Sequence, residues 1–453
     1  MFAANWASAM NTAPAHSPRQ LAAGIVHKLQ AAGHSAFWVG GCVRDFLLGR
    51  EPGDFDIATS ARPEQIEALF PKTIPVGRKF GVIIVVLEEQ QFQIATFRAE
   101  ADYHDGRRPE TVVFADARAD AERRDFTVNG LFFDPTTEKI HDWVGGEADL
   151  RAKVIRTIGS PDERFAEDHL RLLRAVRFAT QLGFAIEPAT FAAVQKHAAK
   201  IKLISAERIR DELIKLFSAP QASRGLELLC ASGLLEHVLP EIAATATCEQ
   251  SPDHHPEGSV FNHLCLMLKH LPPDTPSLLP WAVLMHDVAK PLTASRDPET
   301  GSIHFYTHEK VGADLTEQIM ERLKFPRKDI ETVAEVVRHH MQFKDAPQMR
   351  KATLRRMLLR ETFPLELQLH RLDCLGSNGR LDTFEFLTAQ AAELAQQPAI
   401  HPPLLTGNDL IALGVKPGQA MGALLHELRE KQLSDELKTP DEARHWIRSR
   451  LAL

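Results

Sequence analysis

The strongest constraint on the fold is a change in sequence pattern near residue 150. Before that point, short apolar runs alternate with helical segments, and after it helical periodicity dominates. The predicted strands are "AFWVGG" (36–41), "DFDIA" (54–58) and two strands around a polar turn in "GVIIVVLEEQQFQIATFR" (81–98). The intervening helices are "CVRDFLLG" (42–49) and "PEQIEALF" (63–70), the latter with proline at its start. The pattern predicts an α+β chain: a mixed sheet with helices, followed by helices alone.

Proline-containing breaks divide the helical part of the chain further. A Pro-rich stretch at 271–280 and a second proline break at 402–403 interrupt the helical part. We expect a flexible tail, a mixed head, a helical neck, a helical body and a helical C-terminal tail, at 1–16, 17–152, 153–225, 226–395 and 396–453.

The 453 residues, 44% hydrophobic and 25% charged, are typical of a globular protein. The five cysteines are scattered without a C-x-x-C pair, which predicts reduced thiols rather than a disulfide framework or a zinc ribbon. The start of the chain lacks a signal-peptide pattern, and no apolar run reaches the length of a membrane span. We therefore expect a cytoplasmic protein with no membrane partner.

The net charge of −7 conceals an uneven distribution. Residues 151–224 hold 14 Lys and Arg against 8 Asp and Glu, a local balance of +6, which leaves −13 for the rest. A basic segment of this kind is either a footprint for a polyanion or a solvated helical face, and charge alone does not separate the two.

Asp54 and Asp56 alternate with Phe55 and Ile57, so a strand would place both carboxylates on one face. Two such anions repel each other unless a cation lies between them, although a simple turn is the alternative for an isolated Asp-x-Asp.

Upstream, Gly40 and Gly41 stand between a predicted strand and a helix that carries Arg44, an arrangement suited to a phosphate. Because Mg²⁺ binds through carboxylates and substrate phosphates, this order indicates nucleotidyl transfer.

Four motifs in order carry a family resemblance: "GGCVRD…GDFDIATSA", "TFRAEADYHDGRRPETVVF" (96–114), "RRDFTVNGL" (123–131) and "EDHLRLLRAVRFATQLGF" (167–184). Together they resemble the polymerase-β-like nucleotidyltransferases, and more narrowly the class II tRNA nucleotidyltransferase and poly(A) polymerase family. The resemblance implies that Asp54 and Asp56 hold Mg²⁺ and that Gly40, Gly41 and Arg44 hold the triphosphate. It also implies that the basic neck faces the acceptor stem of tRNA.

The resemblance implies that the last two motifs supply the remaining nucleotide contacts. Asp168 and Arg171 lie three residues apart, so they would share a helix face, either as an ordinary salt bridge or as a pair that reads a base. An Asp offers acceptors and an Arg offers fixed donors, which together could select C and A without a template. The family assigns this work to the matching pair. Further expected contacts or braces are Arg123, Arg124, Asp125, Asn129, Arg174 and Arg177.

The helical body contains a second set of chemistry-bearing residues. They are His263, His286, Asp287, His308, His339, His340 and Asp373, in the order H…HD…H…HH…D. This order resembles the HD superfamily of metal-dependent phosphohydrolases. Helices in a bundle can point imidazoles and carboxylates at one spot, which suits borderline metals. We expect an additional Ni²⁺, Mn²⁺ or Mg²⁺ site there, with a phosphatase or cyclic-nucleotide phosphodiesterase activity.

The resemblance predicts a CCA-adding tRNA nucleotidyltransferase that uses CTP, ATP and Mg²⁺ and releases pyrophosphate. The alternatives are an A-adding or a CC-adding enzyme, a poly(A) polymerase, or an HD phosphohydrolase with an RNA-binding head. The segment 404–425, with Gly407, Gly414 and Gly418, either contacts tRNA or packs on the body. The sequence leaves the oligomeric state open.

Overall fold

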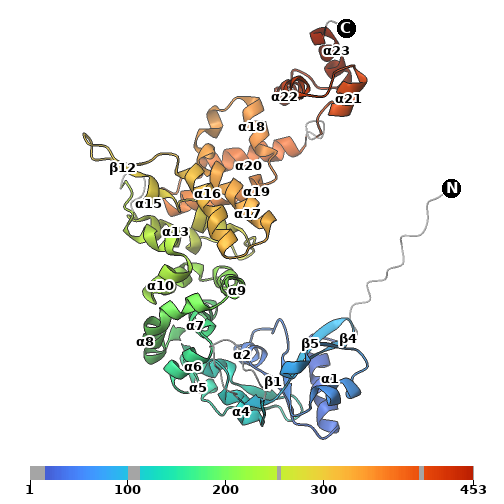
Figure 1. Cartoon of the computed structure of the whole chain (residues 1–453), viewed down its shortest axis with the longest axis vertical. Helices are drawn as coiled ribbons and strands as arrows, with labels where there is room; N and C mark the ends of the chain where they lie inside the picture. Colours follow the sequence, from blue (N-terminus) through green and yellow to red (C-terminus); the bar gives the residue numbers. More distant parts are fainter. Residues whose placement is uncertain (1–15, 100–112, 252–256, 397–401, 452–453) are drawn as a thin grey trace, which may run out of the picture. The chain divides into compact units, whose positions relative to one another are not determined.

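The computed structural model describes residues 16–99, 113–251, 257–396 and 402–451 (Figure 1). The chain forms two compact units. The first comprises Met1–Leu216 and Leu228–Val238, and the second comprises Phe217–Glu227 and Leu239–Leu453.

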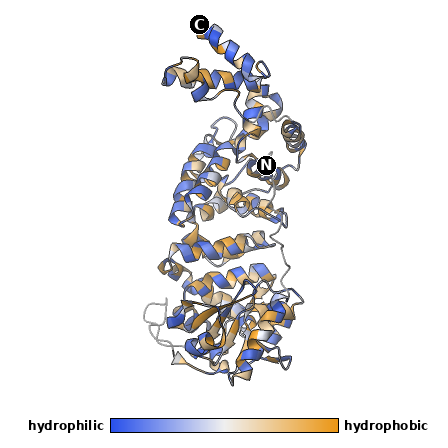
Figure 2. Cartoon of the chain, turned by 90° about the vertical axis from the view of Figure 1, so that its right-hand side faces the viewer, coloured by the Kyte–Doolittle hydropathy of each residue, from blue (hydrophilic) through white to orange (hydrophobic). Residues whose placement is uncertain are grey.

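A seven-stranded mixed sheet forms the centre of the first unit. Its strand order is β3-β4-β5-β2-β1-β8-β9. All neighbouring strands are antiparallel except β2 and β5, which are parallel, with Ile57 opposite Ile94. The strands are β1 (Ala36–Val39), β2 (Ile57–Thr59), β3 (Thr73–Gly77), β4 (Val82–Leu87), β5 (Gln90–Thr96), β8 (Phe132–Asp134) and β9 (Lys139–His141). The strands carry many hydrophobic residues (Figure 2). Buried Val39, Ala58 and Phe132 belong to one hydrophobic core cluster.

Short helices surround this sheet and connect its strands. α1 packs on β1 and β2, and α3 packs on β4. The helices and the short strand pair of this part are α1 (Pro18–Ala31), α2 (Gly41–Leu47), α3 (Pro63–Leu69), η1 (Arg78–Phe80), α4 (Ala117–Glu122), η2 (Thr127–Asn129), α5 (Gly146–Ala152), β6 (Arg98–Ala99) and β7 (Val113–Phe114).

The neck that follows is helical apart from one short parallel strand pair. Its elements are β10 (Val154–Ile155), α6 (Pro161–Glu167), α7 (Leu170–Leu182), β11 (Ala185–Ile186), α8 (Pro188–His197), η3 (Ala198–Leu203), α9 (Ala206–Phe217), α10 (Ala222–Ala231) and α11 (Leu235–Val238).

The second unit is a helical bundle with one small hairpin, β12 (Ala294–Arg296) and β13 (Ile303–Phe305). Its main helices are α13 (Val260–Lys269), α14 (Leu279–Met285), α16 (His308–Arg322), α17 (Arg327–His339), α18 (Lys351–Leu358), α19 (Phe363–Gly376) and α20 (Asp382–Ala395). Shorter pieces are α12 (Pro240–Ala244), η4 (Thr245–Thr247), α15 (Lys290–Thr293) and η5 (His340–Gln348).

The last three helices have a hydrophobic core of their own. They are α21 (Gly407–Ala412), α22 (Gln419–Leu433) and α23 (Pro440–Leu451). Leu410, Leu428 and Ile447 belong to this core. The segment is attached to α18 because Arg355 donates hydrogen bonds to the Leu433 carbonyl (2.9 Å) and to Asp435 Oδ1 (2.6 Å). The proposed tRNA contact of this segment stays a prediction.

The predicted α+β class is confirmed, and so is the polar turn between β4 and β5. Glu88 and Glu89 form that turn with φ of 46° and 65°, a left-handed conformation more usual for Asn or Gly. The predicted strand 54–58 begins later, at Ile57, so Asp54 and Asp56 lie on the extended segment just before β2. None of the helices in the described ranges is long and apolar enough to cross a membrane.

Gly146, at the start of α5, allows that helix to pack against η2. A Cβ atom on Gly146 would lie 2.2 Å from the Thr127 carbonyl oxygen and 2.9 Å from a Leu131 methyl group. Because the Thr127 oxygen belongs to the backbone, the clash cannot be relieved by a change of rotamer.

We predict that Gly146→Ala lowers the free energy of unfolding of the first unit by about 1–3 kcal/mol, the usual cost of overpacking. Gly24→Ala is the matched control, because Gly24 is exposed in the middle of α1 with open space around its Cβ position. It should stabilise the unit by about 0.5–1 kcal/mol. Denaturant unfolding followed by tryptophan fluorescence measures both, and equal effects of the two substitutions would contradict the packing argument.

Candidate active site and metal centre

The two carboxylates of the "DFD" segment face a cavity because the residue between them is buried. Phe55 packs edge-on against Trp38 of β1, with ring centroids 4.9 Å apart. The Val39 N–H donates to the Asp56 carbonyl oxygen at 3.0 Å, which extends the β1–β2 pairing. Phe55 and Ile57 are therefore directed into the core, and Asp54 and Asp56 line the cavity.

The electrostatics of this pair suit a divalent cation. Burial raises the pKa of Asp56, and the neighbouring charge of Asp54 raises it further, whereas Arg124 opposes the shift. A raised pKa means that the ionised carboxylate lacks sufficient positive charge nearby. Two adjacent carboxylates open to a cavity are ligands that Mg²⁺ accepts, so these residues could hold that ion.

Next to the carboxylates, at the end of β1, the chain turns sharply at Gly40. Its φ of 71° and ψ of −125° require glycine, and a Cβ there would lie 2.9 Å from Arg124 Nη1. Its N–H donates to the Leu131 carbonyl at 3.0 Å. Gly40 and Gly41 therefore bring bare backbone to the cavity wall beside an arginine.

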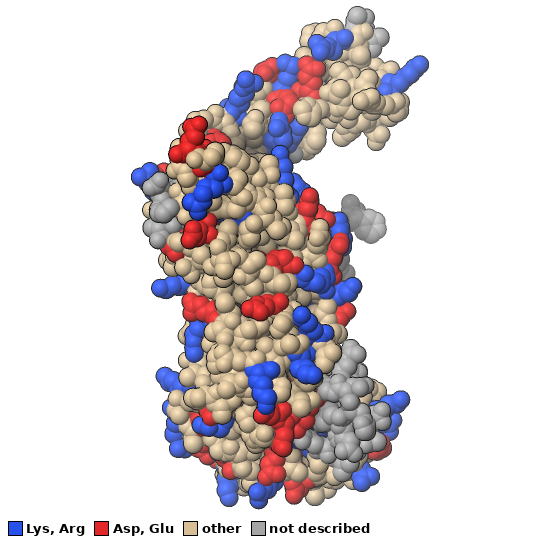
Figure 3. Space-filling view, turned by 60° about the vertical axis from the view of Figure 1, so that its left-hand side comes forward, with Lys and Arg blue, Asp and Glu red and all other residues tan. Residues whose placement is uncertain are grey.

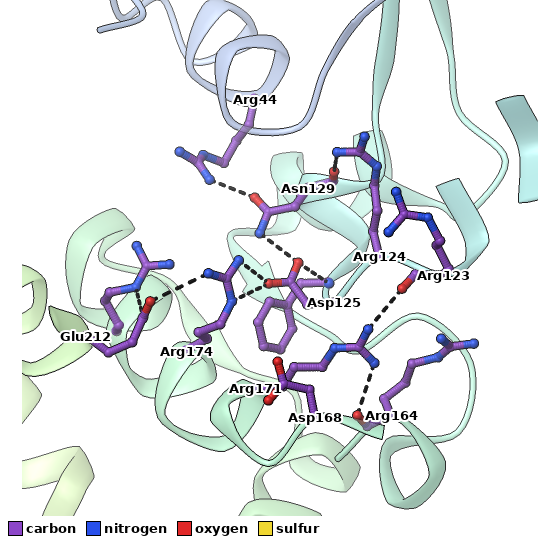
Figure 4. Close-up of polar contacts among 12 residues, drawn as sticks. Arg44, Arg123, Arg124, Asp125, Asn129, Arg164, Asp168, Arg171, Arg174 and Glu212 are labelled. Carbon is purple, nitrogen blue, oxygen red and sulfur yellow. Dashed lines mark hydrogen bonds and ion pairs between the residues drawn. The ribbon is translucent and has the colours of Figure 1, made fainter. Parts of the chain in front are cut away.

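A chain of polar contacts runs from this turn to the neck helix α7 (Figure 4). Arg44 binds both oxygens of Asp45 and donates to Asn129 Oδ1 at 2.7 Å. Asn129 Nδ2 donates to Asp125 Oδ1 at 3.1 Å. Arg174 donates two hydrogen bonds to Asp125 Oδ2, at 2.8 and 2.6 Å, and lies 3.6 Å from Glu212.

Burial alone would raise the pKa of Asp125, but the Arg174 charge and the Asn129 hydrogen bond outweigh it and lower the pKa to about 2. Asp125 is therefore a fixed anion at neutral pH.

Arg123 and Arg124 share one buried carboxylate, Asp120. Arg123 donates to Oδ1 and Arg124 to Oδ2, the latter at 3.0 Å. Arg124 also lies over the Phe132 ring, 5.0 Å from its centroid. Both guanidinium groups are thus held in place while they line the cavity.

Asp168 and Arg171 both line the cavity. They do not share one helix face, as the three-residue spacing predicted. Asp168 lies between α6 and α7 with an extended backbone conformation, and its Oδ1 accepts a hydrogen bond from the Leu170 N–H at 3.0 Å. Arg171, in the first turn of α7, pairs with Glu167 and donates to the carbonyl oxygens of Arg164 (3.1 Å) and Arg123 (3.0 Å). Each side chain is oriented by its own contacts, and neither is the salt-bridge partner of the other (Figure 4).

All thirteen residues that the sequence indicated in the head and neck line this one cavity of about 770 Å³. The sequence analysis missed Arg208, which also lines it and donates to Asp168 Oδ2 at 2.8 Å from helix α9. It also missed Glu212, one turn further along α9, which pairs with Arg177. The i, i+4 spacing of Arg208 and Glu212 in "ERIRDELIK" was the available signal.

Only part of the positive excess of residues 151–224 lies at the cavity, because seven of its fourteen Lys and Arg are exposed: Arg151, Lys153, Arg156, Lys196, Lys200, Lys202 and Lys215. Its arginines at the cavity are paired with carboxylates: Arg171 with Glu167, Arg174 with Asp125, Arg177 with Glu212 and Arg208 with Asp168. On the face drawn in Figure 3, basic and acidic side chains are interspersed. The four arginines at the cavity are therefore each balanced by a carboxylate, so an anionic ligand would meet oriented guanidinium groups there rather than the net excess of the segment.

In the second unit, five of the seven residues expected at the HD site line a cavity of about 660 Å³: His286, Asp287, His308, His340 and Asp373. His263 is fully buried beside them, with Nε2 3.0 Å from Asp373 Oδ1. Two sets of three residues bring their ligand atoms within 4.8 Å of one another: His263, His286 and Asp287, and Asp287, His308 and His340.

His339 lies apart from both sets. Its Nδ1 is 3.4 Å from Glu335 and 3.8 Å from Glu366, and it lines a different cavity. Its neighbour His340 starts the next helix and points the other way, which the repeated "HH" does not reveal.

The chemistry of the first set suits a metal ion. Nδ1 of His286 lies 2.8 Å from the Val283 carbonyl oxygen and so carries the proton in the neutral ring, which leaves a lone pair on Nε2. That Nε2 is buried and makes no hydrogen bond within the described residues. The Asp287 Oδ2 atom lies 3.2 Å away from it. Nitrogen and carboxylate ligands together suit borderline divalent metals. The sequence analysis missed Lys290, which is buried with Nζ 2.7 Å from the same oxygen.

Comparison with known proteins gives three family matches. Residues 36–156 match the poly A polymerase head domain, 183–245 the probable RNA and SrmB-binding site of polymerase A, and 255–373 the HD domain.

Two relatives and one solved structure cover much of the chain. An A-adding tRNA nucleotidyltransferase from Deinococcus radiodurans is 36% identical over 425 residues, covering 90% of this chain and 94% of the relative. A CCA-adding enzyme from Geobacillus stearothermophilus is 47% identical over 218 residues, 48% of this chain and 54% of the relative, so that match spans about half of each. The crystal structure of the Bacillus stearothermophilus CCA-adding enzyme in complex with CTP matches with a TM-score of 0.74 and 28% identity, covering 96% and 98% of the two chains.

We predict that Asp125→Asn lowers the free energy of unfolding of the first unit by about 2 kcal/mol at neutral pH, because a pKa near 2 stabilises the ionised folded form. The folded-state pKa is depressed, so this contribution is present above the ordinary pKa of an aspartate and is lost as the pH falls through about 2. Denaturant titrations of both proteins at a series of pH values should converge between about pH 4 and pH 2. A difference that stays constant over this range would mean that Asp125 acts through packing.

Proposed function

The chain belongs to the family of tRNA nucleotidyltransferases and poly(A) polymerases that carry an HD domain, and from this premise we propose that it adds C, C and A to the 3′ end of tRNA. The substrates would be CTP, ATP and a tRNA that lacks these nucleotides. One observation carries the proposal: a single cavity holds the acidic pair, the arginines and the Asp168–Arg171 surface together.

The transfer step needs little from the protein beyond position and charge. The oxygen of the tRNA 3′-hydroxyl forms a bond to the α-phosphorus, the bond from that phosphorus to the β-phosphate oxygen breaks, and pyrophosphate leaves while the hydroxyl proton passes to solvent. Asp54 and Asp56 would hold Mg²⁺, which when bound favours the ionised hydroxyl and neutralises charge on the phosphates.

Other residues that line the same cavity supply the triphosphate contacts in this proposal. Arg44, Arg123 and Arg124 are held by Asp45, Asp120 and Asn129, so their guanidinium groups are already oriented. Preorganised charge costs little at the moment of reaction. Gly40 and Gly41 would let the phosphates approach the backbone.

Asp168 and Arg171 would select the base. Cytosine and adenine each present an amino donor beside a ring-nitrogen acceptor, which complement a carboxylate and a guanidinium. Guanine and uracil present a carbonyl acceptor beside a ring N–H donor, so both contacts would be mismatched. Arg208 holds one oxygen of Asp168, whose remaining lone pair can accept the amino group. Selection of this kind requires no template strand.

In the second unit we propose a divalent ion, Ni²⁺, Mn²⁺ or Mg²⁺, held by His263, His286, Asp287 and Asp373. The cavity beside these residues is also lined by Lys344 and Arg380, whose charges suit a phosphate ester. The proposed activity is hydrolysis of a phosphate monoester or of a 2′,3′-cyclic nucleotide.

We predict that a tRNA lacking its last three nucleotides gains two residues with CTP alone and three with CTP and ATP together, and gains none with ATP alone. Product lengths on a sequencing gel measure this directly. An A-adding enzyme would leave the tRNA that lacks three nucleotides unchanged and would extend, with ATP, only a tRNA that already ends in CC. A long A tail would identify a poly(A) polymerase, and two residues with both nucleotides present would identify a CC-adding enzyme.

The two proposed activities use different residues, so they should separate by mutation. The double variant Asp54→Ala/Asp56→Ala should lose transfer by at least a thousandfold and keep hydrolysis of 2′,3′-cyclic nucleotides or p-nitrophenyl phosphate. The double variant His286→Ala/Asp287→Ala should do the reverse. Hydrolysis by the native chain no faster than by this second variant would refute the phosphohydrolase proposal and leave the transferase proposal intact.

A further inference from the structure

Two phenylalanine rings of the first unit are exposed close to each other beside the cavity. Phe80, at the end of η1, and Phe114, on β7, each have 40% of their surface exposed. Phe114 lies against the backbone of Gly81, the residue after Phe80. Gly81 has a φ of 75°, and a Cβ atom on it would lie 3.3 Å from Phe114 Cε1. Large apolar side chains that are exposed together indicate a surface that a ligand covers.

Two arginines accompany these rings. Cζ of Arg62 lies 5.3 Å from the centroid of the Phe114 ring. Arg98 is directly opposite Phe114 in the β6–β7 pair, and its Nη1 donates to the Phe80 carbonyl oxygen at 3.4 Å. Within the described ranges neither guanidinium group is in an ion pair, whereas every other arginine of the cavity is paired with a carboxylate. The charges of Arg62 and Arg98 are therefore available to an anion.

These four residues form a surface, here called the aromatic platform, that borders the cavity on one side of the acidic pair. In the sheet, β2 lies between β5 and β1. Val82 of β4 and Gln93 of β5 line the cavity on the β5 side, and the Gly40 turn of the proposed phosphate subsite follows β1. The platform adjoins the β5 side, because Phe80 and Gly81 directly precede Val82 and because Arg98 itself lines the cavity.

The geometry of nucleotidyl transfer determines which ligand reaches that side. In an in-line displacement, the attacking and the leaving oxygens lie on opposite sides of the phosphorus. With the triphosphate on the β1 side, the 3′-hydroxyl of the RNA approaches the acidic pair from the β5 side. The nucleotides behind that hydroxyl then cross the aromatic platform. Unpaired bases of RNA stack on aromatic rings, and arginines contact their phosphates.

We propose that the aromatic platform binds the single-stranded 3′ end of the tRNA, with a base stacked on the exposed rings of Phe80 or Phe114 and the adjoining phosphates at Arg62 and Arg98. The inference rests on the proposed transfer activity only for the direction from which the RNA enters. Stacking tolerates any sequence because every base has a π face. The same surface therefore accepts the RNA end before and after each nucleotide is added.

Photo-crosslinking of the full chain tests this contact without reference to catalysis. A 5-iodopyrimidine is placed in turn at each of the last three positions of a tRNA that ends in CC. Each tRNA is irradiated at saturating protein concentration without any nucleoside triphosphate, and the crosslinked peptide is identified by mass spectrometry. We expect a crosslink at Phe80 or Phe114, because iodopyrimidines react with aromatic side chains that are stacked on them. Crosslinks only at other residues, or none, would overturn the proposal.

Kinetics of ATP addition test the contribution of the rings. Phe80→Ala/Phe114→Ala should raise the KM for a tRNA that ends in CC by about five- to hundredfold, the usual cost of lost base stacking, and should leave the KM for ATP within about twofold. Phe80→Tyr/Phe114→Tyr keeps both rings and should match the native chain. Val76→Ala is the matched control, because Val76 is 71% exposed on β3 of the same hairpin but lies outside the platform.

The outcomes separate this inference from the proposed transfer activity. A native KM for tRNA in the double alanine variant, or an equal rise in Val76→Ala, would overturn the platform and leave the transferase proposal intact. A crosslink at Phe80 or Phe114 in a chain that extends no tRNA would refute the transferase and support the platform as an RNA site. Circular dichroism melting identifies a variant that fails to fold. In that case Phe80→Leu/Phe114→Leu, which keeps apolar volume but removes the rings, replaces it with the same expected rise in KM.

Discussion

The buried carboxylate of Asp125 connects the head, with its seven-stranded sheet, to the helix that carries Arg171. An anion in this position costs several kcal/mol unless its oxygens are paired. Arg174 from α7, Asn129 from η2 and the adjacent Phe126 N–H provide those partners. Asn129 also holds Arg44 beside the Gly40 turn. The distance between the proposed phosphate subsite and the proposed base-reading pair therefore depends on one fully satisfied carboxylate.

Hydrophobic packing fixes the direction of the two acidic side chains, Asp54 and Asp56. Asp54 and Asp56 are directed into the cavity because Phe55 is trapped against Trp38 and Ile57 is buried in β2. Moving this segment by one residue would exchange core and cavity side chains. Burial first, and the neighbouring charge of Asp54 second, raise the pKa of Asp56, and the packing of Phe55 against Trp38 holds the pair in this position.

The sequence predicted the mixed head, the helical remainder and the motif positions well, because period and spacing are local properties. It could not predict contacts made by distant residues. Arg208 is forty residues from Asp168 and looked like one more charge on an amphipathic helix. Asp168 was expected on a helix face, but the chain breaks between α6 and α7 just at that residue. His339 and His340 are indistinguishable in sequence, and only the transition from α17 to η5 sends one to the cavity and the other away. Much of the motif at 96–114 lies outside the described residues.

The hydrogen bonds from His286, His308 and His340 to carbonyl groups three residues earlier would have a consequence for how the proposed site in the second unit takes up a metal ion. Each imidazole is oriented by a carbonyl group of its own stretch of chain, in α14 for His286, in β13 for His308 and in α17 for His340. At the proposed site an incoming ion would need to shed water but would meet imidazoles that are already oriented, so the exchange of one ion for another would not require unfolding. The metal that occupies such a pocket in a cell would follow the relative supply of the competing ions as much as the shape of the pocket.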